Sequence, residues 1–328
     1  MSKPFDELNY DDGIARIRDE YIYVKSKKKV SRSDQIRINK LVIPPSWKDV
    51  WVSGDPNSPI QATGFDDKGR KQYKYHTAHI EKAEKEKFIR LLNFINALPK
   101  LNKQMIKSEK SPPYDIDRVI ATMLTLVKLL HIRVGKEIYA KTNKSYGISS
   151  LRKKHLKIDG DTIYLRFKGK SKQILNYRLV NSKLANHLKM LLKLSGDRLF
   201  QFVDDNKIKI ITDTDLNLYI QEYMGKNFTV KDFRTYAANH LFIKNLLNET
   251  KKRKPKNQKT IKKNIQKSIA QTAKYLKHTK AISKKSYIMS FAVNLYMNNP
   301  KYFADRKDKS VNDVLLELLH KYKFEIMK

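Results

Sequence analysis

Two residues that suit phosphoryl transfer lie close together near the end of the chain. His278 stands nine residues before Tyr287, and the stretch 274–287 contains five lysines and no acid. A tyrosine oxygen can attack a phosphodiester, and a nearby imidazole can hold a phosphate oxygen. The pair alone is weak support for catalysis, because the chain has 18 tyrosines and most tyrosines in amphipathic helices are packing residues.

Three cationic residues elsewhere could complete such a site. Arg133 follows an apolar helical stripe, and Lys170 lies in a basic turn between two predicted strands. Arg234 falls in the first turn of a helix that Thr229 and Asp232 are expected to cap, where free N–H groups favour an anion. Arginines neutralise non-bridging phosphate oxygens, and a cation can protonate the leaving oxygen. Each cation alone is also compatible with a solvated surface residue, but together they suit phosphoryl transfer without a metal.

The composition points to a polyanionic partner. The chain of 328 residues has 69 Lys and Arg against 33 Asp and Glu, a formal net charge of +36, spread along its length. Nucleic acid is the expected partner of such a field. Cysteine is absent, which excludes disulfides and thiolate chemistry, and no apolar run is long enough to span a membrane. The N-terminus does not resemble a signal peptide, and no GxxxxGK[ST] phosphate loop is present.

Residues 1–85 are expected to form a small antiparallel β domain, since short apolar stretches alternate with Gly and Pro turns. Predicted strands cover residues 21–24, 49–52, 60–63 and 71–75, with a short helix over 33–41. Tyr73 and Tyr75 share one face of the last strand, near Arg70. Aromatic rings interleaved with cations can contact DNA, although a pair of core tyrosines is an equally good interpretation.

Residues 86–328 are expected to form a mostly α-helical domain. A helix is predicted over 77–97, a loop over 100–114, and a second helix from the apolar stripe Ile116 to Val134. Asp159-Gly160 predicts a hairpin that leads to strands flanking the basic turn 168–172.

The chain beyond the hairpin strands is predicted to be helical. The Lys-rich segment 251–267 is interpreted as a loop running into a helix, and helices over 265–277 and 284–297 should flank His278. Ser283 is the expected N-cap of the second, with Tyr287 in its first turn, and Ser310 should cap a last helix ending near Tyr322.

Several motifs follow one another along the chain in the order found in the type IB DNA topoisomerases. The sequence resembles specifically the compact poxvirus, giant-virus and bacterial branch of that family. The resemblance covers nearly the whole chain. It rests on the N-terminal stretches 41–51 and 61–76, on Arg133-Val-Gly-Lys136-Glu-Ile-Tyr139 with 145–151, on Phe167-Lys-Gly-Lys170, on Val230-Lys231-Asp-Phe-Arg234 through Asn239, and on the spacing of His278 and Tyr287.

The resemblance implies an α+β protein: a small N-terminal antiparallel β domain and a helical catalytic domain of the tyrosine recombinase and type IB topoisomerase fold, with a lysine-bearing β-hairpin. A monomer would close as a clamp around duplex DNA. Tyr287 would form a 3′-phosphotyrosyl bond and the duplex would swivel before religation, with neither ATP nor metal. Arg133, Arg234 and His278 would hold the phosphorane, and Lys170, helped by Arg133, would protonate the 5′ oxygen. The implied DNA contacts are Arg70, Tyr73, Tyr75, Lys136, Tyr139, Lys231 and Asn239.

Two other functions are compatible with parts of the pattern. Tyrosine recombinases share the chemistry, but they typically carry a His three residues before the second arginine, where this chain has Lys231, and they lack this N-terminal domain. A non-enzymatic DNA-packaging protein would explain the charge but not the ordered motifs. Ser171 and Ile138 depart from the poxvirus pattern, so the resemblance does not decide whether the pentapyrimidine preference of the poxvirus enzymes is shared. The expected location is with DNA inside the cell: the virion and cytoplasmic replication site for a virus, or the nucleoid and cytoplasm for a bacterium.

Overall fold

The structure is a computed structural model and describes residues 10–327. The chain divides into two compact units, one extending to Lys87 and one from Phe88 onward, and the boundary falls inside the helix α2 (Thr77–Ser108). Within the described residues, no helix is both long enough and apolar enough to cross a membrane.

The first unit is built on a five-stranded antiparallel sheet with the order β2-β1-β3-β4-β5, which confirms the predicted β domain. Its core contains Ile14, Ile38, Trp47 and Val52. Strand β1 was not predicted; it lies between β2 and β3, where Ile14 pairs with Tyr23 and Val52, contacts that local sequence does not reveal. The elements are η1 (Tyr10–Asp12), β1 (Ile14–Ile17), β2 (Glu20–Tyr23), α1 (Arg32–Lys40), β3 (Lys48–Val52), β4 (Ile60–Phe65) and β5 (Lys71–Tyr75).

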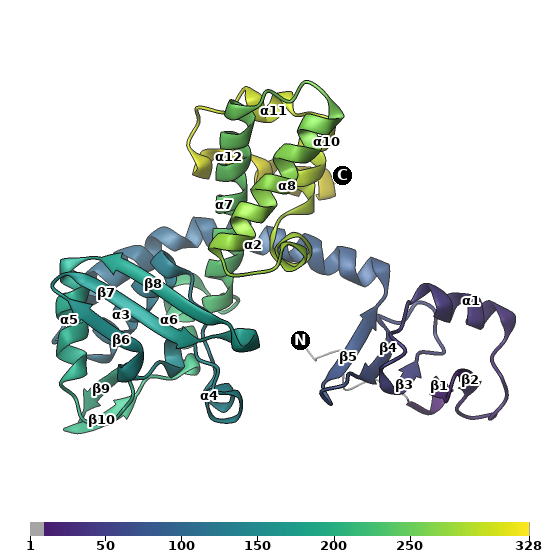
Figure 1. The fold of residues 1–328 in the computed structure, drawn as a ribbon, viewed down its shortest axis with the longest axis horizontal. Helices are drawn as coiled ribbons and strands as arrows, with labels where there is room; N and C mark the ends of the chain where they lie inside the picture. Colours follow the sequence, from purple (N-terminus) through teal and green to yellow (C-terminus); the bar gives the residue numbers. More distant parts are fainter. Residues whose placement is uncertain (1–9, 328) are drawn as a thin grey trace. The chain divides into compact units, whose positions relative to one another are not determined.

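The second unit is mostly helical, as expected, and contains two small sheets (Figure 1). The order β6-β7-β8 forms one antiparallel sheet and β9 pairs with β10 in the other. Its helices are α3 (Ile116–Leu130), α4 (Glu137–Asn143), α5 (Ser182–Leu192), α6 (Asp213–Met224), α7 (Val230–Lys252), α8 (Gln258–Tyr275), α9 (Lys280–Ile282), α10 (Ser290–Asn298), α11 (Lys301–Ala304) and α12 (Val311–Met327). Its strands are β6 (Leu156–Asp159), β7 (Thr162–Lys168), β8 (Ile174–Val180), β9 (Gln201–Asp204) and β10 (Lys207–Ile210).

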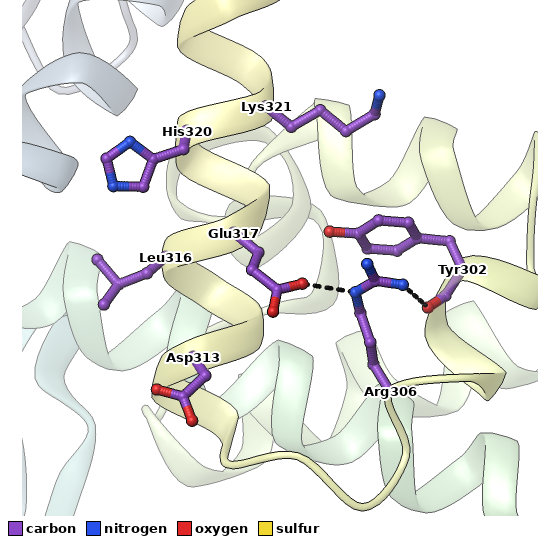
Figure 2. Close-up of a pocket in the computed structure, with 7 residues that line it drawn as sticks. All are labelled: Tyr302, Arg306, Asp313, Leu316, Glu317, His320 and Lys321. Atoms are coloured by element: carbon purple, nitrogen blue, oxygen red, sulfur yellow. Dashed lines mark hydrogen bonds and ion pairs between the residues drawn. The ribbon is translucent and has the colours of Figure 1, made fainter.

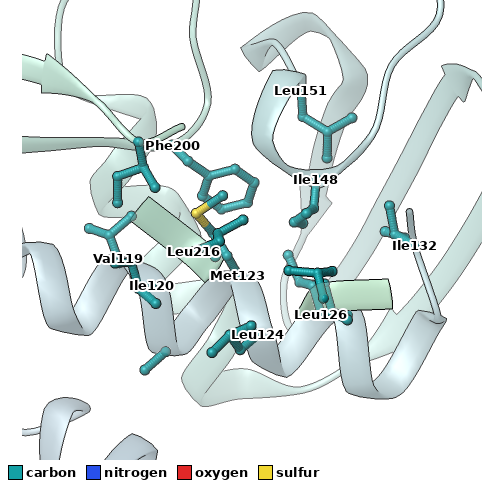
Figure 3. Packing of buried hydrophobic residues seen from close by; sticks show 14 of the residues in the cluster. Val119, Ile120, Met123, Leu124, Leu126, Ile132, Ile148, Leu151, Phe200 and Leu216 are labelled. Carbon is teal, nitrogen blue, oxygen red and sulfur yellow. The ribbon is translucent and has the colours of Figure 1, made fainter. Parts of the chain in front are cut away.

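Helix α7 runs through two hydrophobic cores. Its first turns place Val230 and Phe233 in a cluster with α3 and the β6–β8 sheet, part of which Figure 3 shows. Its later turns place Phe242 and Leu246 in a second cluster with α8, α10 and α12, which gather around α7 in Figure 1. The helix begins at the predicted capping box, since the backbone N–H of Thr229 donates to Asp232 Oδ2 at 2.8 Å. Residues in the first turns of α7 are therefore held at the junction of both cores.

Several predictions about the secondary structure were wrong. The polar stretch after residue 100 is not a loop: α2 continues to Ser108, because Leu101 and Met105 recur at helical spacing and are buried. Helix α3 ends at Leu130 rather than near Val134, since His131 takes the left-handed conformation with φ 53°. The β9–β10 hairpin was missed; its turn residues Asp205 and Asn206 adopt φ of 48° and 57°, which Asp and Asn tolerate.

Candidate active site

Three of the five predicted catalytic residues are in direct contact. Arg234 comes from α7, His278 from the loop after α8, and Tyr287 from the end of the next helical segment. Arg234 Nη2 lies 2.5 Å from His278 Nε2, and the His278 and Tyr287 rings stack with centroids 4.5 Å apart and planes at 29°. Residues far apart in the chain therefore meet as a guanidinium, an imidazole and a phenol.

Arg234 is fixed rather than mobile. Its side chain is 4% exposed, and its guanidinium donates to the backbone oxygen of His131 and, at 2.9 Å, to that of Leu276. Burial and the nearby charge of Arg133 lower its pKa to about 10, while Tyr287 acts in the opposite direction. Arg234 thus remains charged at neutral pH and offers a preorganised cation to an oxyanion.

His278 is placed by a left-handed residue after α8. Lys277 has φ 54°, and the backbone N–H of His278 then donates to the carbonyl of Ala273 at 2.8 Å. Burial, followed by Arg234, Arg133 and Lys170, lowers the pKa of His278 to about 3, so the ring is neutral at pH 7. Since an arginine can only donate, Nε2 accepts from Arg234 and the ring proton lies on Nδ1, which is 3.4 Å from Ser283 Oγ.

Tyr287 ends a π-helical turn, Ser283–Tyr287, that continues directly from α9. The prediction that Ser283 caps this helix was wrong: Thr279 is the N-cap, and its side chain accepts from the Ile282 N–H. Both residues are good caps, but Ser283 is fully buried and faces His278 instead. Tyr287 therefore lies at the C-terminal end of its helical segment, a π-turn of the kind often found at functional sites.

Asn239 holds the backbone on both sides of Ile288. Its side chain is 1% exposed, Nδ2 donates to the Tyr287 carbonyl at 3.0 Å, and Oδ1 accepts from the Met289 N–H at 2.8 Å. The side chain that was predicted to contact DNA is thus engaged inside the protein, at the segment that carries the phenol.

Replacing Asn239 with alanine is expected to slow covalent attachment to DNA by about 10-fold or more and to lower the free energy of unfolding by about 1–3 kcal/mol, because the Met289 N–H loses its buried acceptor. Single-turnover cleavage and urea unfolding measure the two effects. Asn245→Ala is the matched control, since Asn245 lies on the same helix and its side chain donates to Thr272 Oγ1 rather than to the segment that carries Tyr287. A normal cleavage rate for Asn239→Ala would contradict the expectation.

Arg133 and Lys170 approach the same centre with unengaged side chains. Arg133 lies half-buried in the loop after α3, and its position follows from its backbone, where its carbonyl accepts from the Ile148 N–H at 2.8 Å. Lys170 is exposed in the short turn between β7 and β8, which the Gly169 N–H closes by donating to the Gln173 carbonyl at 2.8 Å. Within residues 10–327 neither side chain has a hydrogen-bond or ion-pair partner, yet both lie close enough to lower the pKa of His278.

The predicted DNA contacts are surface residues apart from Asn239, and each unit is described by itself. In the first unit Tyr73 and Tyr75 share a face of β5 with ring centroids 6.0 Å apart, while Arg70 is paired with Asp66 at 2.6 Å. In the second unit, Lys136 precedes α4, Tyr139 is 53% exposed on α4, and Lys231 is exposed in the first turn of α7.

Tyr177 on β8 was not predicted to belong to the site. Burial raises the pKa of its phenol, and Arg234 and Arg133 act in the opposite direction, so the ring lies near both arginines. The sequence feature that could have found it is the two-residue spacing of Leu175, Tyr177 and Leu179, which places the three side chains on one face of the strand.

The comparisons with known proteins identify the family. A model of the eukaryotic DNA topoisomerase I catalytic core matches residues 71–310, and one of the bacterial DNA topoisomerase IB N-terminal domain matches residues 20–66. The chain belongs to the type IB DNA topoisomerases. It is 52% identical to DNA topoisomerase 1B of Acanthamoeba polyphaga mimivirus, over 98% of this chain and 99% of that one. It is 29% identical to DNA topoisomerase 1B of vaccinia virus (strain Copenhagen), over 78% of each chain.

These matches confirm the resemblance predicted from the motifs and disfavour both alternatives, a tyrosine recombinase and a packaging protein. A crystal structure of the XerH site-specific recombinase bound to its difH substrate is also similar, with a TM-score of 0.34 and 14% identity over 67% of this chain and 55% of that one, which is too remote to carry an argument. In the described part of the topoisomerase chain, no group of His, Asp and Glu is arranged to hold a metal ion.

A separate pocket of about 750 Å³ lies among the C-terminal helices (Figure 2). In it Arg306 stacks on Tyr302, 3.7 Å from the ring centroid, and donates to Glu317 at 2.6 Å. None of the predicted site residues lines this pocket, so it is separate from the candidate active site.

Proposed function

We propose that this type IB DNA topoisomerase relaxes supercoils with Tyr287 as the nucleophile, and with Arg133, Lys170, Arg234 and His278 as its catalytic partners. The observation that supports this most directly is the contact of Arg234, His278 and Tyr287. The two unengaged cations complete the set, because a scissile phosphate needs donors for its oxygens and a proton for its leaving group.

In the cleavage step, the Tyr287 oxygen attacks phosphorus and gives up its proton to solvent water while the bond from phosphorus to the 5′ oxygen breaks. Lys170 gives a proton to that oxygen, so a 3′-phosphotyrosyl bond and a free 5′-hydroxyl result. Arg133 and Arg234 hold the non-bridging oxygens. After the duplex swivels, the 5′-hydroxyl attacks the phosphotyrosine and the protons return. Cleavage and religation each exchange one phosphoester bond for another, so the reaction needs no external energy source.

His278 must exchange tautomers to help in this step. In the free protein its Nε2 accepts from Arg234, whereas an Nε2 that holds a phosphate oxygen must donate. Ser283 permits the exchange, because its hydroxyl can accept from Nδ1–H or donate to bare Nδ1. A phosphate oxygen between Arg234 and His278 would then receive a hydrogen bond from each, and the ring needs no net charge.

The polarity of the covalent complex tests the proposal. A duplex labelled at the 5′ end of the cleaved strand should transfer its label to the protein, whereas a label at the 3′ end should remain on the released fragment. Mass spectrometry of the digested complex should find the nucleotide on Tyr287. The opposite polarity, or attachment to another residue, would overturn the assignment.

We also propose that the protein is a monomer that closes as a clamp around duplex DNA, and that it works in the virion or at the replication site of a virus. Tyr73 and Tyr75 in the N-terminal unit, and Lys136, Tyr139 and Lys231 in the catalytic unit, would contact the duplex. For Asn239 we propose positioning of Tyr287 in place of the DNA contact.

Residues 86–328 alone are expected to retain cleavage but to bind DNA more weakly, by about 10-fold or more, since all five catalytic candidates lie in this fragment while the paired tyrosines do not. Base-stacking aromatics contribute about 1–3 kcal/mol each. Binding and single-turnover cleavage at saturating protein separate the two effects. The full chain with Tyr73→Ala and Tyr75→Ala should reproduce part of the binding loss. A folded fragment without cleavage would refute the division into a binding and a catalytic domain.

A further inference from the structure

The unengaged guanidinium of Arg133 depends on its backbone for its position, and that backbone is tied to a second stretch of chain. Besides the Ile148 bond to Arg133, the Ser149 hydroxyl donates to the carbonyls of Val134 and Gly135, at 3.0 and 2.7 Å. Gly135 has φ +73°, and a Cβ there would lie 2.3 Å from the Gly147 nitrogen, so the two stretches are as close as backbones can be.

The two stretches are also linked through one carboxylate and one arginine. Glu137, the first residue of α4, accepts from Arg152 Nη2 at 2.6 Å and from Arg198 Nη1. Arg198 is 7% exposed and also donates to the Ser149 carbonyl. Glu137 therefore connects the loop that carries Arg133 to Arg198, and Arg198 connects back to Ser149 on the facing stretch.

Burial lowers the pKa of Arg198, and Glu137 is the main charge that opposes this shift. Without the carboxylate, a nearly buried guanidinium would lose its counter-charge and its anchor at once. A buried charge left without its partner moves toward water or draws water in. Either response would release Ser149, and with it the backbone that sets the Arg133 guanidinium.

We propose that Glu137 and Arg198 form a positioning pair, which holds the Arg133 guanidinium where it can contact the scissile phosphate. Neither residue contacts the reacting atoms. Their effect passes through Ser149 to the backbone of residues 133–135. The inference rests on the catalytic role proposed for Arg133.

Glu137→Ala is expected to slow single-turnover cleavage at saturating protein by about 10- to 100-fold, within the range by which misplaced groups slow catalysis. DNA affinity should change by less than about 3-fold. Asp197→Ala is the matched control, because the exposed carboxylate of Asp197 pairs with Arg152, as Glu137 does, but is not the hydrogen-bond partner of Arg198, and the variant should cleave at the normal rate. Glu137→Gln keeps the shape of the side chain and should give an intermediate rate if the alanine variant fails to fold.

A double-mutant cycle separates positioning from general destabilisation. In an Arg133→Ala background, Glu137→Ala should cost little further rate, whereas in a Lys170→Ala background it should cost its full factor. An equal loss in both backgrounds, or a normal rate for Glu137→Ala, would overturn the inference. A normal rate for Arg133→Ala would instead refute the site assignment on which the inference rests.

Discussion

Replacing Tyr287 with phenylalanine is expected to abolish both covalent attachment to DNA and relaxation, lowering each rate by at least about 10⁴-fold, since loss of an enzymatic nucleophile costs this much or more. The change removes one oxygen and keeps the ring that stacks on His278. Folding and non-covalent DNA binding should therefore stay near normal. Gel analysis of covalent adducts with a labelled duplex measures the effect.

Tyr275→Phe is the matched control, because Tyr275 precedes the same loop and is 55% exposed. It should form adducts at nearly the normal rate. If Tyr287→Phe still formed adducts at a comparable rate, another tyrosine would be the nucleophile. The stacking of His278 and Tyr287 would then serve only to hold the fold.

Replacing Lys170 with alanine is expected to slow cleavage by roughly 10²–10⁴-fold, the usual contribution of a general acid. The ammonium group of a lysine carries protons that it can donate to the 5′ oxygen. Sulfur at the 5′-bridging position leaves without a proton. A phosphorothiolate substrate should therefore restore most of the rate of Lys170→Ala.

Arg234→Ala should not be rescued by sulfur, because the proposed task of Arg234 is to hold non-bridging oxygens. Lys172→Ala supplies the second control: it removes a charge from the same turn and should affect the rate only slightly. If sulfur fails to rescue Lys170→Ala while DNA binding is intact, Lys170 is a phosphate clamp and Arg133 becomes the leading candidate for the acid.

Local patterns predicted the parts of the fold that local forces determine. The Thr229–Asp232 capping box begins α7 where expected, and strand alternation placed Tyr73 and Tyr75 on one face. Local pattern failed where two signals competed. Thr279 and Ser283 both suit an N-cap, and only the burial of Ser283 against His278 shows which one serves.

The supports of the site could not be predicted, because they join residues that are distant in sequence. Asn239 reaches a carbonyl 48 residues away, and Glu137 reaches an arginine 61 residues away. Both are polar residues on helices, and sequence alone predicts that such residues are exposed to solvent or contact DNA. Motifs identified the reacting groups, whereas the groups that hold them emerge only from the tertiary structure.

Relaxation of supercoiled plasmid in EDTA and without ATP tests the central claim most directly. The full-length chain should convert both negatively and positively supercoiled plasmid to a ladder of relaxed topoisomers, and Tyr287→Phe should leave both substrates unchanged. Absence of relaxation by a folded, DNA-binding chain, or relaxation that persists in Tyr287→Phe, would contradict the account.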